Sequence, residues 1–364
     1  MSGLSNSVEG PELPHTIEEL TPAYLSGLLG QSFPDVRVTA LEVVETKVGH
    51  TGKARLKLEL DPTGRVEGVP TEVCIKGSLS ARYGGTRIHI LEAQFYAFMR
   101  QWAGLPLARH YGSEWRSTPN KQGLVLIEDL IAAGGRFGHS NDQMGVDAVA
   151  AGLETLARIH GATWDHPDLP SLDWLPLSMG TRMDDDQVSL FEDFRRRNYE
   201  RDDYRAFLPD WAYDRRGEFT RAYAALCEIE KTLKPRCLVH GDAHQGNSCV
   251  RANGERAWVD WQVARRGSPW RDVSYFIVGS LTIEERRASE RELLRQYREH
   301  LGAHGAAIPS QDEMWASYRR WAMYGCQSWI GSLDEWGQKA APMSERFFTA
   351  LDDLETLKAL SVAF

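Results

Sequence analysis

The chain has 364 residues, of which 42% are hydrophobic and 26% are charged, a composition typical of a globular protein long enough for two lobes. Its formal net charge of −9 argues against a nucleic-acid partner, because binding the phosphate backbone requires an excess of Lys and Arg. Five scattered cysteines without a Cys-x-x-Cys pair indicate reduced thiols, and neither a signal peptide nor a membrane-length apolar run is found. We therefore expect a cytoplasmic protein without a membrane partner.

The beginning of the chain predicts a tail and a short helix. Residues 1–14 are polar and contain Gly and Pro, so we expect a loose tail. Thr16 precedes Glu19 by three residues, which is the spacing of a capping box, in which hydroxyl and carboxylate each accept a backbone N–H. A short helix capped by Thr16 is therefore expected to follow the tail.

Two strands joined by a glycine-bearing turn come next. Residues 36–45 are strand-like, and residues 54–60 alternate apolar and polar side chains, which indicates a half-buried strand. The connecting turn contains Gly49 and Gly52 but lacks the full Gly-x-Gly-x-x-Gly pattern. By themselves these two glycines predict only a turn.

The following strand and helix each carry a charged residue that needs a partner. Residues 72–76 form a short apolar strand in which Lys76 points away from the face of the valine and isoleucine. The amphipathic helix at 87–99 contains Glu92. A lysine in a short apolar strand costs stability unless it is paired, and Glu92 is its natural partner. From these residues alone, two solvated side chains remain an alternative to the pair.

The boundary between the lobes is expected near residue 130. Residues 123–130 form an apolar strand that ends in acidic residues, and a glycine-containing segment follows. We therefore predict an N-lobe over residues 1–130 and a mainly helical C-lobe over residues 131–364. The first C-lobe helix has an apolar stripe over residues 147–160 and is expected to stop at Gly161.

The residue types most suited to catalysis gather after a short strand in the C-lobe. The apolar run Cys237–Val239 leads into a polar loop that contains His240, Asp242 and Asn247. A second apolar strand ends at Asp260. Amide and carboxylate oxygens are ligands that Mg²⁺ accepts, and a further carboxylate can take a proton from a substrate hydroxyl.

A predicted hairpin brings these residues together. Asn253-Gly254 between two strand-like runs predicts a type I′ turn, which needs positive φ at both central positions. Counting outward from a turn centred between them sets Asn247 opposite Asp260, with Asp242 nearby. The hairpin therefore predicts a magnesium site beside a proton-accepting carboxylate.

The pattern His240-Gly-Asp242, four residues, Asn247 and then Asp260 resembles the catalytic signature of the aminoglycoside phosphotransferase and choline kinase-like superfamily. The variant Asp-Trp-Gln at 260–262, followed by Gly-Ser-Pro-Trp-Arg-Asp272, looks most like the ecdysteroid kinase-like branch. The resemblance covers roughly residues 40–335, with its sharp motifs between 240 and 272. It implies an α+β, bilobal, protein-kinase-like fold with an antiparallel-sheet N-lobe and a mainly helical C-lobe.

The resemblance also implies a reaction, the transfer of the ATP γ-phosphoryl group to a hydroxyl of a small molecule. Asp242 would be the catalytic base, and Asn247 and Asp260 would hold Mg²⁺. Lys76, steadied by Glu92, would bind the phosphates that are not transferred. The other implied nucleotide-binding residues are Gly49 and Gly52, over the phosphates, and Ile127, Glu128 and Leu130, whose main chain would bond adenine. Asp272 would hold the catalytic loop in shape, and His160 would be a hydrogen-bonded core residue.

The acceptor is less sharply predicted. Residues 181–211 are densely charged with both signs and are expected to form a solvated helix pair over the acceptor site, with substrate gating as an alternative. Five aromatic residues at mostly three-residue steps are more typical of a core than of a pocket, but rings that line the pocket would favour a bulky apolar alcohol such as a steroid, or a hydroxyacyl compound, over an aminoglycoside. These residues are Trp315, Tyr318, Trp321, Tyr324 and Trp329.

Acidic residues near the C-terminus leave the opposite preference open. They would favour a cationic acceptor, although an exposed acidic helix face explains them equally well. These residues are Asp334, Glu335, Glu345, Asp352, Asp353 and Glu355.

Two other classes of function remain as alternatives. In a metal-dependent hydrolase, His240, Asp242 and His244 would form the ligand set, which leaves Asn247 and Asp260 without a role. A nucleotide-binding pseudokinase would use the same fold without catalysis. A protein substrate is disfavoured because the chain lacks an Ala-Pro-Glu segment, and the sequence does not indicate the oligomeric state.

Overall fold

The computed structural model divides the chain into two compact units, of which each is internally well packed. The first unit comprises Met1–Arg136 with Cys249–Ala264, and the second comprises Phe137–Ser248 with Arg265–Phe364. The sequence predicted one boundary, at residue 130. In the structure the first unit extends to Arg136 and also contains the later segment 249–264. The residues that the structure describes are 12–49, 51–62, 68–80, 86–99, 102, 104–117, 120–178, 196–198, 200–206, 208–234, 236–304, 306–330 and 337–361.

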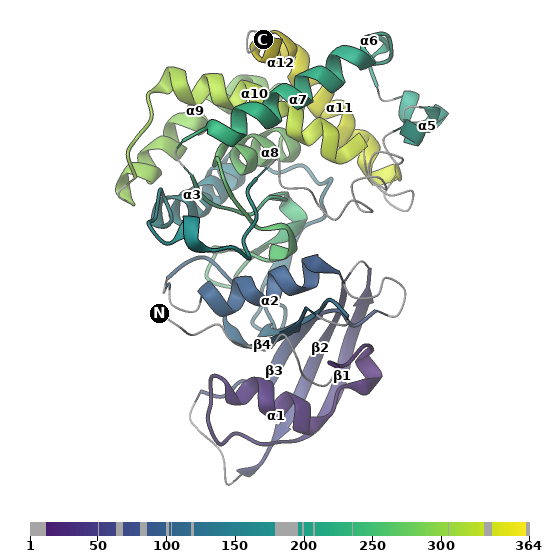
Figure 1. Cartoon of the computed structure of the whole chain (residues 1–364), viewed down its shortest axis with the longest axis vertical. Coiled ribbons are helices and arrows are strands. Elements are labelled where there is room, and N and C mark those ends of the chain that lie inside the picture. The colour runs from purple at the N-terminus through teal and green to yellow at the C-terminus, as the bar shows by residue number, and fades with distance from the viewer. Residues whose placement is uncertain are drawn as a thin grey trace. The chain divides into compact units, whose positions relative to one another are not determined.

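An antiparallel sheet forms the base of the first unit (Figure 1). Within the described residues it has five strands in the order β1-β2-β3-β5-β4. Of these, β1, β2, β3 and β5 confirm predicted strands, whereas β4 was not predicted. The bounds are β1 (Val38–Val48), β2 (Gly52–Leu60), β3 (Glu72–Gly77), β4 (His110–Arg116) and β5 (Gln122–Glu128).

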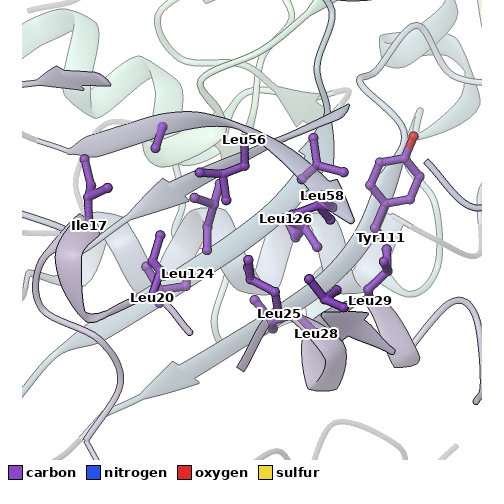
Figure 2. Packing of buried hydrophobic residues seen from close by; sticks show 14 of the residues in the cluster. Ile17, Leu20, Leu25, Leu28, Leu29, Leu56, Leu58, Tyr111, Leu124 and Leu126 are labelled. Atoms are coloured by element: carbon purple, nitrogen blue, oxygen red, sulfur yellow. The ribbon is translucent and has the colours of Figure 1, made fainter. Parts of the chain in front are cut away.

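One face of this sheet is covered by the helix α1 (Pro22–Gly30) and the 3-10 helix η1 (Ile17–Glu19). Successive residues of a strand point to opposite faces, so every second residue of β2 and β3 joins this core. Figure 2 shows Leu25, Leu28 and Leu29 of α1 beside leucines of the sheet. Burial of each such side chain contributes roughly 2 kcal/mol. Because one face of the sheet is packed in this way, the remaining residues of β3 point to the opposite face.

The tail and the first helix differ from the prediction. Leu13 is buried, because the Gln122 side chain binds its main chain through two hydrogen bonds of 3.0 Å. Residues 12–14 are therefore anchored, and residues 1–11 lie outside the described part. Thr16 makes no capping hydrogen bond, because the Glu19 carboxylate accepts the N–H of His15 instead, at 2.7 Å.

The helix α2 (Arg87–Met99) lies on the other face of the sheet and has the predicted bounds. Ile90 and Ala93 of this helix pack with Trp115 of β4. Gly123 of β5 lets the helix approach closely, because a Cβ there would lie 2.2 Å from the His89 carbonyl oxygen. The polar side of β3 therefore faces α2.

The second unit is mainly helical, as the predicted fold class requires (Figure 1). Two short strands, β7 (Cys237–Val239) and β10 (Arg265–Gly267), pair antiparallel within it. The helix α8 is buried along its whole length. The helices are α3 (Val146–Ala162), α5 (Asp202–Arg205), α6 (Asp210–Asp214), α7 (Arg216–Thr232), α8 (Trp270–Ser280), α9 (Ile283–Ala303), α10 (Gln311–Ile330), α11 (Gly337–Asp353) and α12 (Thr356–Ser361), with the 3-10 helices η3 (Leu169–Ser171) and η4 (Gln245–Asn247).

Two predictions about the second unit need comment. The helix α3 ends at Ala162, one residue after Gly161, and Gly161 is closely packed, since a Cβ there would lie 2.7 Å from His304 Cβ. The predicted end of this helix is thus confirmed to within one residue. Residues 179–195, which include much of the charged segment 181–211, lie outside the described part of the chain. No helix in the described part is both long and apolar enough to cross a membrane.

Candidate active site

The hairpin that carries Asp260 is present, but its turn differs from the predicted one. The strand β8 (Ser248–Val250) is a neighbour of β9 (Arg256–Trp258), and between them the Arg251 N–H donates to the Glu255 carbonyl at 2.8 Å. Gly254 has a φ of +85°, whereas Asn253 is not in the positive-φ region. The connection is thus a three-residue loop that ends at a left-handed glycine, and the type I′ prediction was wrong.

The longer loop changes the register by one residue. In a β-ladder a shift of one residue turns every side chain to the opposite face. The predicted pairing of Asn247 opposite Asp260 required a two-residue connection, so it does not follow from the three-residue loop. The convergence of these two side chains on one magnesium ion stays a prediction.

Lys76, Glu92 and Asp260 meet within the first unit, and we call them the Lys76 triad. The Lys76 ammonium lies 2.8 Å from Glu92 Oε2 and 2.7 Å from Asp260 Oδ1. Asp260 is 184 residues further along the chain than its lysine partner. Lys76 and Glu92 are buried, whereas the Asp260 side chain is 30% exposed. The structure thus brings Lys76 to the predicted partner and to the predicted metal ligand.

The Lys76 triad contains one ammonium and two carboxylates. Burial by itself would lower the pKa of Lys76, but Asp260 and Glu92 raise it above its usual value, so Lys76 is charged. Burial raises the pKa of Glu92, and the attraction of Lys76 offsets this effect only in part. Since carboxylates outnumber ammonium groups here, a further cation next to the partly exposed Asp260 is electrostatically favoured.

Trp261 fixes Asp260 to α2. Its indole ring stacks on Phe95 of that helix, with ring centroids 4.2 Å apart and planes 9° apart. Its main-chain N–H donates to Glu92 Oε1 at 3.0 Å, and its indole N–H donates to the Trp258 carbonyl at 3.1 Å. Asp260 itself has a left-handed backbone, with φ 68° and ψ 57°, which a non-glycine residue adopts only when its surroundings hold it there.

The predicted phosphate-covering turn joins β1 and β2. The Gly49 N–H donates to the Thr51 carbonyl at 3.1 Å within this turn. Gly52 must lack a side chain, because a Cβ there would lie 2.4 Å from the Leu79 carbonyl oxygen. The glycine is therefore explained by packing alone, and phosphate binding by the turn stays a prediction.

The predicted hinge residues lie at the end of β5, where several of their groups are already engaged. The Glu128 carboxylate binds Arg251 at 2.7 and 2.9 Å, so this side chain ties β5 to the hairpin. Burial would raise the pKa of Glu128, but the hydrogen bond to Arg251 brings it below its usual value. Ile127 is buried in the sheet, and the Leu130 carbonyl accepts the Gly135 N–H at 2.7 Å. Adenine binding by this main chain stays a prediction.

The predicted catalytic loop lies in the second unit and is held by Asp272. Its buried carboxylate accepts the N–H of His240 at 2.5 Å and the N–H of Gly241 at 2.9 Å. His160 donates to the same carboxylate at 3.2 Å. Burial would raise the pKa of Asp272, but the His160 hydrogen bond and charge, with His240 and the Gly241 N–H, keep it below its usual value. Asp272 and His160 thus have the structural roles predicted for them.

Asp242 and Asn247 contact each other within this loop. The Asn247 amide nitrogen donates to the Asp242 main-chain oxygen at 2.9 Å and to its Oδ2 at 3.1 Å. This arrangement orients the amide oxygen of Asn247 as the acceptor for another group. Asp242 is 35% exposed, and His244 Nε2 lies 3.6 Å from its Oδ2. The loop thus presents a partly exposed carboxylate, placed as a base would be, beside an oriented amide oxygen of the kind that Mg²⁺ accepts.

The hydrolase alternative has no ligand set. In the described residues, which include His240, Asp242 and His244, no three His, Cys, Asp or Glu side chains gather as metal ligands. The buried His240 ring instead accepts the Asp242 N–H through Nδ1 at 3.3 Å. These residues therefore shape the loop.

Other residues of the site were not predicted in these roles. Arg271 and Tyr324 both bind the Gly241 carbonyl, and Tyr275 faces Asp242, whose hydrogen bond adds to the effect of burial in raising the tyrosine pKa. The motif around Asp272 contained Arg271, but no sequence signal linked it to a carbonyl in the loop. For Trp261, the available signal was its place in the Asp-Trp-Gln motif at 260–262.

The aromatic residues of α10 divide into two sets. Tyr318 and Trp321 are buried core residues, as the prediction favoured. Tyr324 contacts the catalytic loop, and Trp329 lies 6.0 Å from the His244 ring and stacks on Tyr275. Asp334 and Glu335 lie outside the described residues, and the other four acidic residues are exposed.

Comparisons with known proteins agree with this geometry. The structure is similar to that of a microcompartment-associated aminopropanol kinase, with a TM-score of 0.53 and 11% identity over 88% of this chain and 94% of the other. It is also similar to a proposed aminoglycoside phosphotransferase from Ralstonia eutropha JMP134, with a TM-score of 0.51 and 15% identity over 90% of this chain and 97% of the other. These similarities show the kinase-like fold. No curated protein sequence matches the chain. The model of the ecdysteroid kinase-like family matches residues 93–308, and the chain belongs to that family of small-molecule kinase-like phosphotransferases.

Proposed function

We propose that the protein is an ATP- and Mg²⁺-dependent phosphotransferase that moves the γ-phosphoryl group to a hydroxyl of a small molecule. The observation that carries this proposal is the Lys76 triad, in which an ammonium lies within 3.0 Å of both Glu92 and the distant Asp260. A purely structural ion pair would not require a third, partly exposed carboxylate with a strained backbone. Family membership supports the same reaction class.

In the proposed reaction, Asp242 orients the acceptor hydroxyl and takes its proton as the new O–P bond forms. The bond between Pγ and the bridging oxygen breaks at the same phosphorus, and ADP leaves. A positioned base of this kind contributes typically about 10²–10⁴-fold in rate. Lys76 binds the phosphates that stay on ADP, and Glu92 keeps its ammonium in place.

The residues present fit a magnesium ion. Asp260 is a partly exposed carboxylate in a cluster with excess negative charge, and the Asn247 amide oxygen is oriented by two hydrogen bonds from its nitrogen. When bound, Mg²⁺ would offset the phosphate charge that develops during transfer. Two protein ligands are enough, since Mg²⁺ in such enzymes also binds phosphate oxygens and water.

For the acceptor, we favour a bulky apolar alcohol or a hydroxyacyl compound over an aminoglycoside. The support is the aromatic cluster next to the loop, in which the buried Tyr275 faces Asp242 and packs on the rings of Tyr324 and Trp329. Apolar ring surfaces favour an apolar partner, whereas a polycation would require several carboxylates around the loop. The adjacent Arg271 carries a positive charge, which also disfavours a cationic acceptor.

The test is the release of ADP from ATP by the purified protein with a panel of alcohols. The panel contains sterols, hydroxyacyl thioesters, choline-like amino alcohols, sugars and aminoglycosides. We expect Asp242→Asn to bind ATP almost as the wild type does, yet to transfer phosphate about 10²–10⁴-fold more slowly. The exposed Asp312→Asn, on α10, serves as the matched control.

Two outcomes would contradict the proposal. An Asp242→Asn variant with full activity would show that another group is the base. A wild-type protein that binds ATP but neither transfers phosphate nor hydrolyses ATP slowly through Asp260 would be a pseudokinase.

A further inference from the structure

We propose that Arg271 and Tyr324 are positioning residues that hold the Gly241 carbonyl and so direct the Asp242 carboxylate at the acceptor. The inference rests on the proposed phosphotransfer, because it concerns how the carboxylate of the proposed base is oriented. Within the described residues, the hydrogen bonds of these two side chains go to Gly241, to each other and to Ser178. We call the pair, with the carbonyl that it binds, the carbonyl clamp.

The contacts of the clamp converge on one oxygen. Arg271 Nε and Nη2 donate to the Gly241 carbonyl at 3.2 and 3.1 Å. The Tyr324 hydroxyl donates to the same oxygen at 2.6 Å and accepts from Arg271 Nη2 at 2.6 Å. The guanidinium also lies 4.1 Å from the centre of the Tyr324 ring, so the two side chains stabilise each other.

The clamped carbonyl belongs to the peptide that precedes Asp242. Gly241 has a φ of +85°, a conformation that other residues rarely adopt, so the direction of this peptide is unusual and must be maintained. Its own N–H is bound by Asp272, while its C=O is bound by the clamp. The two ends of the residue before the base are therefore fixed from opposite sides, by neighbouring residues of α8.

The chemistry of Arg271 argues for a role beyond stability. Its guanidinium is buried, and within the described residues it hydrogen-bonds only neutral oxygens, those of Gly241, Tyr324 and Ser178. A buried charge whose hydrogen bonds reach no carboxylate is a costly way to stabilise a fold, and apolar residues of similar volume often do so as well or better. Its planar fork can bind one carbonyl with two N–H groups, which Lys cannot do.

Kinetic measurements can distinguish a positioning role of the clamp from a general loss of stability. Tyr324→Phe keeps the ring over Arg271 but removes the hydroxyl from the carbonyl. We expect kcat to fall about tenfold while KM for ATP changes less than about twofold, because the Lys76 triad is untouched. Arg271→Lys should lower kcat further, since it keeps the charge but loses the fork.

The matched control is Tyr318→Phe on the same helix. Tyr318 is fully buried, whereas Tyr324 is half-buried, and the Tyr318 hydroxyl donates to Glu290 at 2.9 Å, away from the catalytic loop. Each phenylalanine variant removes one hydrogen-bonded hydroxyl, so urea denaturation should show a loss of stability in both, with the larger loss in Tyr318→Phe. Only Tyr324→Phe should slow turnover.

A second measurement needs no acceptor at all. Amide hydrogen exchange followed by mass spectrometry should show faster exchange in peptides that cover residues 238–247 for Tyr324→Phe, and unchanged exchange there for Tyr318→Phe. Equal exchange in this segment for both variants and the wild type would overturn the clamp. If the wild type transfers no phosphate to any alcohol, the proposed function fails, yet the exchange result still decides whether the clamp holds the loop.

Discussion

The candidate site residues fall into two halves, one within each unit, which are held by different kinds of interaction. In the first unit, Lys76, Glu92 and Asp260 are held by contacts between charged side chains from separate elements. In the second unit, the loop before Asp242 is held through its main chain, by Asp272 at the N–H groups and by Arg271 at a carbonyl.

This difference separates a responsive half from a rigid one. A cluster of ionisable groups responds to pH and to any bound ion, because each proton or cation that binds changes the net charge of the cluster. Main-chain hydrogen bonds to a carboxylate whose pKa is low do not change near neutral pH. We therefore expect nucleotide binding to depend on conditions and the base to keep its place.

The largest expected effect comes from removing the carboxylate that holds the rigid half. Asp272→Ala leaves two buried N–H groups and His160 without their acceptor, so we expect a loss of roughly 5 kcal/mol in the free energy of unfolding. Urea denaturation measures it, with the exposed Asp173→Ala as control. A loss below about 1 kcal/mol would mean that the loop keeps its shape without Asp272.

A somewhat smaller effect, dependent on pH, is expected in the responsive half. Lys76→Met removes the ammonium from Glu92 and Asp260, which should cost roughly 3 kcal/mol at pH 7. The folded-state pKa of Glu92 is already raised, and without Lys76 it rises further. The folded protein then takes up a proton that the unfolded chain lacks, so the loss should shrink as the pH falls from 7 to 5.

Urea denaturation at both pH values checks this prediction. Lys57→Met, at an exposed position of β2, is the matched control and should show neither the loss nor its pH dependence. A loss in Lys76→Met that is the same at both pH values would show that Glu92 does not titrate in the folded variant.

The smallest effect concerns Glu230, a buried acidic residue whose protonation should make the stability of the second unit depend on pH. Glu230 accepts the Ser268 N–H at 2.8 Å just before α8, and burial raises its pKa to about 7. The folded state therefore binds a proton that the unfolded state releases near pH 4.5, so wild-type stability should fall as the pH rises towards 7. Glu230→Gln removes this dependence and should gain roughly 2 kcal/mol relative to the wild type between pH 5 and 8.

Glutamine keeps the oxygen that accepts the Ser268 N–H, so the two proteins differ mainly in whether the side chain at position 230 can gain or lose a proton. Urea denaturation at pH 5 and pH 8 gives the comparison. Parallel changes in the two proteins over this interval would show that Glu230 is ionised in the folded state at both pH values.

Local patterns predicted much of the fold. Alternation along β2 and β3, and helical spacing over 87–99, depend on which side of an element meets the core, and nearby residues carry that information. Predictions failed where a tertiary contact decided the outcome. Gln122 anchors Leu13 where a loose tail was expected, and Glu19 binds His15 where a capping box was expected.

The sequence by itself determined which residue types the site contains and their order along the chain, because proton transfer and magnesium binding require carboxylates and an amide close together in one loop and hairpin. Only the tertiary structure decided that Lys76 would meet Asp260, that Trp261 would stack on Phe95, and that Tyr324 would reach Gly241. Such contacts join residues that are far apart in the chain, and their geometry depends on how whole elements pack. The shift of one residue at the 252–254 loop shows the same limit at short range, since one turn residue outside the left-handed region was enough to alter the register.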